Sequence, residues 1–323
     1  MMGLFFLASL GLDALLGDPP TWPHPVNFLG RFIRHWDHRV SRQLPAPVIR
    51  FLGALWALCT LLLAGALAYG LTALAFALHP LAGWAFALWG METALAGRCL
   101  VTEAQKVCTW LEGGDLQKAR RQVGMLVGRD TAELRAEEVA AAAVETVAEN
   151  SSDGVVAPLF WAVIGAAWGP AGALAGAWVY KAVNTMDSLL GYRNAQYANL
   201  GWAPARIDDG FNYLPSRLTA ALFCLIDALR GSKKAWQTWR RDGHKHLSPN
   251  AGHPEAAMAG LLGCTLGGGH FYGGTWVEKP TLGTGPAPQA LHIRRACRAL
   301  WALEGILALV FALEVFRCVM AAI

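Results

Sequence analysis

Long apolar segments alternate with short polar ones along this chain, and their lengths match a membrane. Residues 50–78 exceed the ~30 Å thickness of a bilayer's hydrocarbon core, and residues 81–100 nearly match it. His79 and Pro80 form the predicted turn between these segments, which together predict a membrane hairpin. Further apolar spans are predicted at 155–180, 211–229 and 299–319. The fold class that we expect is all-α, a polytopic membrane helical bundle of about five spans plus short or re-entrant helices.

The span at 155–180 is interrupted at Gly169 and Pro170, which leaves two topologies open. One full crossing would place residues 181–210 on the far side of the membrane from the acidic region that precedes the span. A re-entrant segment, or a polar loop that folds back into the bundle, would keep both regions on one side. The sequence favours neither topology.

The segment before the first long span predicts two short helices. Residues 1–20 have an apolar core but no basic start and no cleavage signal, so we expect a retained helix that is interfacial or partly buried. The proline-rich run 18–25 ends it. Residues 28–43 alternate apolar and basic groups at helical spacing, which predicts an interfacial helix. We expect His24 to be a hydrogen-bonded structural residue, with contact to a ligand as the alternative.

Composition supports a membrane protein. The chain is 54% hydrophobic and 15% charged, against roughly 25% charged in soluble domains, and its mean hydropathy is +0.33. Its net charge of +4 comes from basic residues in loops, which indicates orientation in the membrane and no nucleic-acid surface. We expect one membrane-embedded domain over residues 1–323, with a water-exposed helical region at 103–150 and a basic loop at 231–256. Both face the cytoplasm, which predicts a cytoplasmic (inner) membrane location with a cytoplasmic active site.

The seven cysteines are scattered and form no C-x-x-C pair. Most of them lie in apolar segments, so we interpret them as small buried hydrophobic residues without disulfide bonds or a zinc site.

The acidic stretch 130–154 carries the first candidate site. Asp130 followed by Glu133 predicts a capping box that starts a helix, and the run 150–154 is predicted to end it. Glu138, Glu145 and Glu149 lie within about 40° of one another on that helix. Carboxylates at a helix carboxyl end are unfavourable, so we expect a bound cation such as Mg²⁺ to offset them. A solvated acidic face is the alternative.

A second polar face follows the interrupted span. Lys181, Asn184 and Ser188 lie at i, i+3 and i+7, with Asp187 at the margin. Charged groups next to an apolar span are costly and by default mark a functional site. A buried Lys181–Asp187 ion pair with a purely structural role is the alternative.

A third candidate is an anion site at residues 250–255. His253 and Pro254 are expected at a helix start, with Pro254 in the first helical position, and the free backbone N–H groups there attract anions. Gly252 is expected to let the backbone approach a ligand closely. An ordinary proline-started helix is the alternative. The glycine-rich stretch 267–274 lacks a following Lys and Ser or Thr, so it is no Walker A loop.

Four stretches in order carry a family resemblance. They read GDPPTWPHPVNFLGRFI from residue 17, ENSSDGVVAPLFW from 149, YKAVNTMDSLLGYRN from 180 with GWAPARIDD from 201 and NYLPSRLTA from 212, and SPNAGHPEAAMAG from 248. Together they resemble the CobD/CbiB family of cobalamin biosynthesis, and the resemblance covers essentially the whole chain.

The resemblance implies a multi-pass membrane enzyme, adenosylcobinamide-phosphate synthase. Such an enzyme joins the free propionate of adenosylcobyric acid, a corrinoid, to the amine of (R)-1-aminopropan-2-ol O-phosphate. ATP and Mg²⁺ are the expected driving reagent and cofactor. The implied surroundings are the lipid bilayer and other cobalamin-assembly enzymes.

Set against this reaction, the polar residues take expected roles. The catalytic residues are Lys181, Asn184 and Asp187, of which Lys181 stabilises phosphate charge and Asp187 is either a metal ligand or the base. The nucleotide and metal site comprises Glu145, Glu149, Asn150, Asp153, Asp208 and Asp209. Its expected metal ligands are Glu149, Asp153 and Asp187. The substrate phosphate is assigned to Asn250, Gly252, His253, Glu255, Lys245 and Arg217.

Two other classes of protein remain as alternatives. A transporter or channel would explain a broken helix that flanks charged residues. A non-catalytic membrane sensor or scaffold would leave the aligned carboxylates without a purpose.

Overall fold

The computed structural model describes residues 1–17, 24–191 and 196–321. Contacts within the chain divide it into two compact units. The first unit comprises Met1–Ala96, Ala157–Asn212 and Phe311–Ile323, and the second comprises Gly97–Val156 and Tyr213–Val310. The predicted all-α class is confirmed, since only four short strands interrupt the helices of the described residues.

Helices make up the described part of the first unit. They are α1 (Met2–Leu15), α2 (Pro25–Arg39), α3 (Ala46–Leu78), α4 (Pro80–Glu92), α8 (Ala157–Gly165), η2 (Ala166–Trp168), α9 (Gly169–Leu190) and α10 (Trp202–Phe211). The last turns of α14 (Ala290–Met320) also belong to it. His24 precedes α2 and accepts the N–H of Val26 on Nδ1 at 3.2 Å, as expected of a structural histidine.

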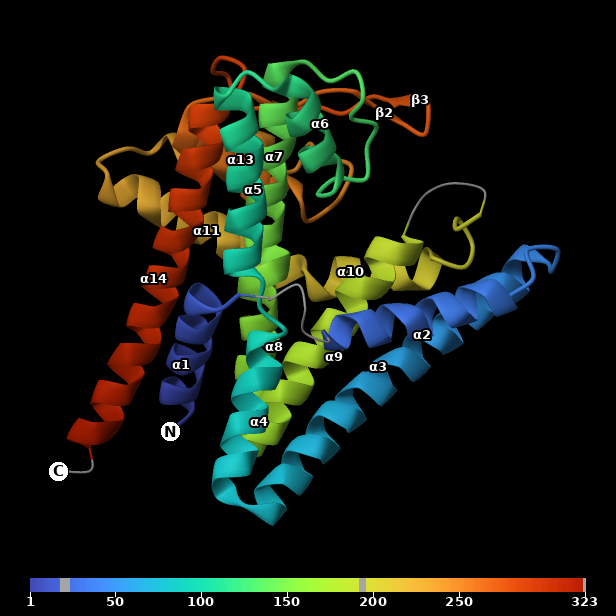
Figure 1. Ribbon diagram of the computed structural model, residues 1–323, viewed down its shortest axis with the longest axis vertical. Helices are drawn as coiled ribbons and strands as arrows, with labels where there is room; N and C mark the ends of the chain where they lie inside the picture. The colour runs from blue at the N-terminus through green and yellow to red at the C-terminus, as the bar shows by residue number, and fades with distance from the viewer. Residues whose placement is uncertain (18–23, 192–195, 322–323) are drawn as a thin grey trace. The chain divides into compact units, whose positions relative to one another are not determined.

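Helices α3 and α4 form the predicted hairpin (Figure 1). His79 lies at the turn and accepts the backbone N–H of Leu81 on Nδ1 at 3.1 Å. Helix α3 has 33 residues, which is about 50 Å at 1.5 Å per residue. The return helix α4 has only 13 residues and ends at Glu92, shorter than the predicted span 81–100. Thr93 contributes to this end, because its Oγ1 donates to the carbonyl of Gly90 at 3.0 Å.

Helices α8 and α9 pack against each other as a tight hairpin (Figure 1). The chain turns through η2 and Gly169, whose φ of +75° suits only glycine. A side chain on Gly176 would lie 2.2 Å from the carbonyl oxygen of Trp161, so the two backbones touch. In one straight helix these residues would be about 22 Å apart. Of the two topologies that the sequence left open, the chain therefore doubles back between 155 and 180.

Within the described part of the chain, three apolar helical stretches are long enough to cross a membrane. They are Ala46–Leu78, Ala136–Leu190, which contains the reversal just described, and Ala290–Met320. The most apolar windows of the first and third are only 22% buried within the protein. Apolar helices this exposed need apolar surroundings, which supports a membrane bundle.

The predicted span 211–229 does not reach this length. It forms α11 (Tyr213–Leu229), a helix of 17 residues. The buried Asp227 near its end accepts the N–H of Ala235 at 2.9 Å and so connects α11 to the next helix. The expected single membrane domain with water-exposed regions at 103–150 and 231–256 stays a prediction, because a division by contacts does not place the lipid.

The second unit combines helices with two short hairpins. Its helices are α5 (Gly97–Glu112), α6 (Leu116–Gly124), α7 (Ala136–Ser151), the π-helical turn η1 (Ser152–Val156), α11, α12 (Lys234–Asp242), α13 (Gly252–Leu262) and the first turns of α14. Its strands are β1 (Leu266–Gly267), β2 (His270–Tyr272), β3 (Thr275–Val277) and β4 (Thr281–Leu282). Strand β1 pairs with β4 and β2 with β3, both antiparallel. Much of the predicted basic loop 231–256 is thus helical.

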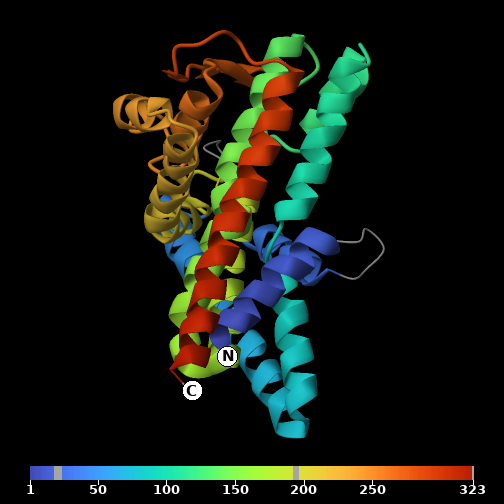
Figure 2. The ribbon, with the colours of Figure 1, turned by 90° about the vertical axis from the view of Figure 1, so that its left-hand side faces the viewer.

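Helix α7 is the core of this unit. Its alanine-rich middle, from Val139 to Val144, is buried, and small side chains let α5, α6 and α13 pack closely around it. Helices α11, α12 and α13, drawn in amber and orange, gather together in Figure 2.

The predicted start of α7 is wrong. The helix starts at Ala136, where Arg135 and Glu138 form the capping box. Asp130 instead accepts the N–H groups of Gly273 and Gly274 in the β2–β3 turn, at 3.2 and 2.8 Å.

The regular α-helix does end within the predicted run 150–154, at Ser151, but the chain stays helical beyond it. Asn150 and Ser151 donate to carbonyls of their own helix, Thr146 and Val147, and the chain continues through η1 into α8. Glu149 therefore lies near the end of α7, but the helical path continues through η1 and α8, so the dipole argument for a bound cation at a free helix end does not apply.

Parts of two sequence motifs lie outside the described residues. Residues 18–23 and 192–195, which include parts of the first and third motifs, lie outside the described residues.

All seven cysteines are free, but only Cys108, Cys264 and Cys297 are buried. Cys59 and Cys318 are exposed on the long apolar helices α3 and α14, so the prediction of burial holds for part of the set.

Candidate functional site

Glu145 lies in the middle of α7, where two other segments of the second unit meet it. Its Oε1 accepts the backbone N–H of Gly267 in β1 at 2.7 Å. Its Oε2 lies 2.9 Å from Nη2 of Arg129, whose side chain is only 4% exposed. Glu145 thus ties the α6–α7 loop and a strand to α7, and each of its two oxygens already has a protein partner.

A second helix brings another carboxylate into the same region. Glu255 on α13 is buried. Burial, and after it the negative charges of Glu145 and Glu149, raise the pKa of Glu255 well above its ordinary value. His246 Nε2 lies 4.0 Å from Glu255 Oε2, and burial lowers the pKa of His246. Three carboxylates from α7 and α13 therefore share one poorly solvated region.

Lys279, which follows β3, contributes a positive charge to this region. Burial alone lowers the pKa of Lys279, but its hydrogen bond to Tyr272 and the charges of Glu255 and Glu145 raise that pKa above its ordinary value. Burial and then the charge of Arg129 lower the pKa of His270 in β2. We call this set the buried charged cluster: Arg129, Glu145, Glu149, His246, Glu255, His270 and Lys279.

The cluster joins two sites that the sequence kept apart. Glu145 and Glu149 were assigned to nucleotide and metal, and Glu255 to the substrate phosphate, yet their charges interact directly. The cluster's other members lie in loops and strands outside the quoted motifs; of these, only His246 was considered from the sequence, in a weak His244–His246 metal pair. Only the fold of the second unit brings these segments together.

Asn150 and Asp153 continue from Glu149 along the same helical path, and both are half-buried. Asp153 lies in the π-helical turn η1, and such turns are frequent at functional sites. Among the residues that the structure describes, no three His, Cys, Asp or Glu side chains form a ready-made metal site. The metal-binding roles of these residues stay predictions.

The predicted phosphate site is partly assembled. Asn250 is buried and accepts from Nη1 of Arg217 at 3.3 Å and from Ser216 Oγ at 3.5 Å. The guanidinium of Arg217 also lies over the ring of Tyr213, 3.6 Å from its centroid. Arg217 and Asn250 thus lie together, as the assignment requires.

The expected position of Pro254 at the helix start is wrong. Helix α13 begins at Gly252, so Pro254 is its third residue and not its first. A side chain on Gly252 would lie 2.6 Å from the carbonyl oxygen of Gly243 and 2.5 Å from His246 Cβ. The glycine therefore permits close packing against the end of α12. Ser248 Oγ accepts the N–H groups of Asn250 and Ala251, both at 3.3 Å, which leaves fewer donors for an anion.

The remaining polar residues of this site have protein partners. Nδ1 of His253 accepts from Trp239 Nε1 at 2.8 Å. Burial, and then the charge of Arg217, lower the pKa of His253 from 6.5 to about 4, so this side chain is neutral near pH 7. Lys245 Nζ donates to Asp242 Oδ1 at 2.8 Å. Lys245 is therefore paired with Asp242. The pKa of Asp242 is lowered, chiefly by its hydrogen bond to Arg241.

The predicted catalytic residues belong to the first unit. Lys181, Asn184 and Asp187 lie half-buried along α9. Asp187 and Asp209 of α10 lie close enough for their charges to repel. Asp208 and Asp209 were grouped with Glu145 and Glu149, but the structure divides this nucleotide set between the two units.

A chain of buried hydrogen bonds connects α9 with the end of α10. Tyr180 donates its hydroxyl to Asn212 Oδ1 at 2.9 Å, and Nδ2 of Asn212 donates to Asp208 Oδ2 at 3.0 Å. Tyr180 is fully buried and Asn212 is 2% exposed. Asp208 is therefore oriented by its neighbours in the first unit.

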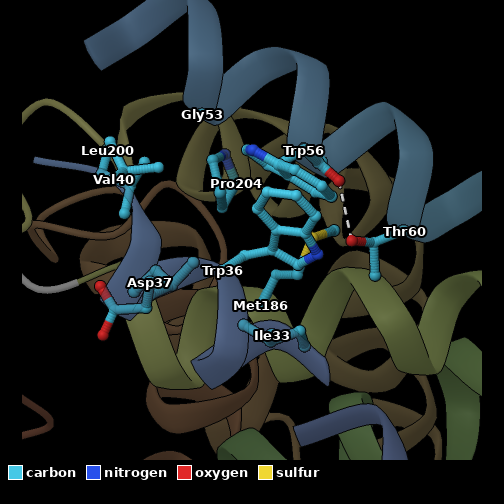
Figure 3. Close-up of a pocket in the computed structure, with 12 residues that line it drawn as sticks. Ile33, Trp36, Asp37, Val40, Gly53, Trp56, Thr60, Met186, Leu200 and Pro204 are labelled. Atoms are coloured by element: carbon cyan, nitrogen blue, oxygen red, sulfur yellow. Dashed lines mark hydrogen bonds between the residues drawn. The ribbon is translucent and has the colours of Figure 1, made fainter. Parts of the chain in front are cut away.

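The first unit also contains a small apolar cavity of about 20 Å³, enclosed by α2, α3, α9 and α10 (Figure 3). Trp36, Met186 and Pro204 are among its lining residues, and Thr60 Oγ1 donates to the carbonyl of Trp56 at 2.7 Å beside it. A space of this size holds about one water molecule and neither a nucleotide nor a corrin. None of the predicted site residues lines this cavity.

The fold and the buried charged cluster define a helical membrane protein with a polar site that suits charged ligands. Comparison with known proteins adds the family. The family model described as CobD/Cbib protein matches residues 6–300, so the chain belongs to the CobD/CbiB family.

Curated relatives match over most of their own length. The "Cobalamin biosynthesis protein CobD" of Klebsiella pneumoniae subsp. pneumoniae is 42% identical over 299 residues, 90% of each chain. That of Listeria monocytogenes serovar 1/2a is 44% identical over 295 residues, 89% of this chain and 90% of its own. The "Cobalamin biosynthesis protein CbiB" of Salmonella arizonae is 40% identical over 298 residues, 90% of each. No solved structure matches the chain.

Proposed function

We propose that this protein is the ligase that forms adenosylcobinamide phosphate from adenosylcobyric acid and (R)-1-aminopropan-2-ol O-phosphate, at the expense of ATP. A role in cobalamin biosynthesis follows from the family. The particular reaction is what the resemblance of the four motifs implies.

The buried charged cluster is the observation that carries this proposal. Buried charges are costly unless they are paired, and perturbed pKa values cluster at functional sites. The second unit keeps three carboxylates close together with an arginine and a lysine. The reactants of the proposed ligation are themselves a carboxylate, an ammonium group and phosphates, so they suit a region with charges of both signs.

The chemistry has two steps. The propionate oxygen attacks the γ-phosphorus of ATP, ADP leaves, and an acyl phosphate forms. The amine nitrogen then attacks the acyl carbon, phosphate leaves, and the nitrogen loses a proton. We assign Lys181 to the developing phosphate charge and Asp187 to that proton, with Asn184 orienting the acyl group.

A magnesium ion fits the available donors. Mg²⁺ prefers oxygen ligands, keeps several waters and needs only one or two protein carboxylates beside substrate phosphates. Glu149, with Asp153 four residues further along the same helical path, is the proposed holder, because residues at this spacing lie on one face and can approach one ion together. Bound there, the ion would neutralise nucleotide phosphate charge.

The substrate phosphate is assigned to Asn250 and Arg217, which already lie together. The cytoplasmic side is the proposed location of this chemistry, since the basic residues around 233–245 follow the positive-inside tendency. The inner membrane is the proposed compartment.

A transporter is the second candidate, and one observation favours it. The α8–α9 hairpin turns at Gly169 and leads into Lys181 and Asp187, as broken helices of transporters lead into their substrate sites. Transport predicts flux without chemical turnover.

The experiment that separates the two uses purified protein in lipid nanodiscs. It is incubated with adenosylcobyric acid, aminopropanol phosphate and ATP with Mg²⁺, and the products are analysed by mass spectrometry. We expect a new amide and one ADP per amide, with neither product when the amine is omitted. Corrinoid uptake into liposomes without amide or ADP would support the transporter instead.

A further inference from the structure

Arg129 and His270 are buried polar residues whose hydrogen-bonding capacity is only partly used. Each residue is 7% exposed. Within residues 1–17, 24–191 and 196–321, nothing accepts a hydrogen bond from Nε of Arg129, and Nε2 of His270 has no partner. Buried polar atoms are nearly always hydrogen-bonded, so exceptions in one place call for an explanation.

The two side chains are held next to each other by the backbone. The N–H of Asp130 donates to the carbonyl of Phe271 at 2.9 Å, and Asp130 in turn accepts from Gly273 and Gly274. These bonds fix the residues just before them, Arg129 and His270, on neighbouring segments. The charge of Arg129 accordingly contributes to lowering the pKa of His270, after burial.

Lys279 completes the group. It lies on the segment between β3 and β4, is half-buried, and its Nζ lies 5.2 Å from the ring centroid of Tyr272, which shares strand β2 with His270. Its charge contributes to lowering the pKa of His270. Arg129 is paired with Glu145 at 2.9 Å, but a guanidinium has five donors and this contact leaves Nε available. Arg129, His270 and Lys279 thus bring two cations and an imidazole nitrogen to one part of the second unit.

We propose that Arg129, His270 and Lys279 form a binding site for a phosphoryl group. A guanidinium fork with a neighbouring ammonium group is the arrangement that proteins use for phosphates, because it supplies directed hydrogen bonds and charge together. The site differs from the set Asn250, Arg217 and Lys245. Its use in catalysis rests on the proposed ligase function, whereas anion binding itself does not.

The test is a calorimetric titration of the purified full-length protein with inorganic phosphate. We expect saturable binding that weakens about tenfold to a hundredfold in Lys279→Met and in His270→Phe, since each change removes a hydrogen bond to a charged ligand. His270→Gln restores a side-chain N–H and should recover most of the affinity. Lys233→Met, at an exposed lysine of the same unit, should bind like wild type. Arg129 is left intact, because its removal would also deprive Glu145 of its cation.

Two further titrations identify the source of the phosphoryl group. A non-hydrolysable ATP analogue and aminopropanol phosphate are each titrated in competition with inorganic phosphate. Displacement by the analogue assigns the site to the nucleotide, and displacement by aminopropanol phosphate assigns it to the amine substrate. Equal binding by wild type, Lys279→Met and His270→Phe would overturn the proposal, as would no saturable binding of any of the three probes.

The outcomes also separate this proposal from the ligase function. Phosphate binding that depends on His270 and Lys279, in a protein that forms no amide, would leave the anion site standing and remove the ligase. If the variants form amide and bind phosphate and both substrates as tightly as wild type, the ligase function stands and the anion site is overturned.

Discussion

Helices α7 and α9 both place polar side chains within apolar stretches, but the two units treat these side chains differently. In the first unit, Tyr180 on α9 is hydrogen-bonded to Asn212, which in turn is hydrogen-bonded to Asp208. In the second unit, Glu145 on α7 forms an ion pair with Arg129 from the α6–α7 loop, and Nε of that arginine has no partner in the described part of the chain.

This difference shows how a polar group in an apolar helix can be interpreted. In a network such as Tyr180–Asn212–Asp208, the polar groups form hydrogen bonds with one another and so orient each other. A cluster with opposed charges and unused donors has capacity left for a charged ligand. The four predictions below test whether this distinction holds, beginning with the largest expected effect.

The largest effect is expected where the buried ion pair is broken. Arg129→Met leaves Glu145 without its cation at a side chain 13% exposed, and breaking a buried pair costs about 3–5 kcal/mol. Chemical unfolding in detergent measures this. The control is Lys118→Met, which breaks the exposed pair with Asp115 and should change stability little. If both variants unfold alike, the cluster is no more important to the fold than surface charge.

The next effect concerns activity in the first unit. Lys181→Met should lower the rate of amide formation roughly a hundredfold, because it removes the cation assigned to the developing phosphate charge, and should leave the melting temperature unchanged. The structural alternative predicts an unfolded protein whose activity returns when Asp187→Leu is added. Rates and melting curves of the single and double variants decide between them.

A smaller, selective effect is expected at Asn250. Removing its side chain should raise the KM for aminopropanol phosphate about fivefold to tenfold, as for the loss of one hydrogen bond, and should spare the KM for ATP. Initial rates with each substrate varied in turn provide the measurement. Weaker use of ATP alone would mean that the two phosphate assignments are exchanged.

The smallest effect is a dependence of stability on pH at His253. Its pKa is lowered from 6.5 to about 4, so between these values the unfolded chain binds a proton that the folded protein does not. This contribution to stability is complete above pH 6.5 and declines as the pH falls towards 4. Melting curves at pH 7.0 and 4.5 should therefore differ less in His253→Gln than in wild type. The same substitution at the exposed His35 should leave the wild-type difference in place.

The sequence predicted the features that depend on local pattern. Apolar length located α3, α14 and the interrupted span, and the turn at His79 is where proline places it. The motif order identified the family that the comparisons confirm. These successes share a cause, since hydropathy and motif order can be read without knowing which segments meet.

The failures also share a cause. Asp130 looks like a helix cap but binds the turn at Gly273 and Gly274, and Asn150 looks like a helix stop but donates to its own helix. Arg129 and Lys279 were not foreseen at all, because their partners lie far away in the chain. Contacts between distant segments decide these cases, and no periodicity reports them.

The central claim is that the buried charged cluster serves ATP-dependent amide formation, and Glu149→Gln tests it most directly. This change keeps the shape of the side chain and removes its charge. The measurement is amide yield by mass spectrometry from adenosylcobyric acid, aminopropanol phosphate and ATP with Mg²⁺, beside the melting temperature of the same preparation. The account predicts amide from wild type and a loss of roughly a hundredfold or more in a variant that melts like wild type. Amide formation at the wild-type rate by Glu149→Gln would contradict it.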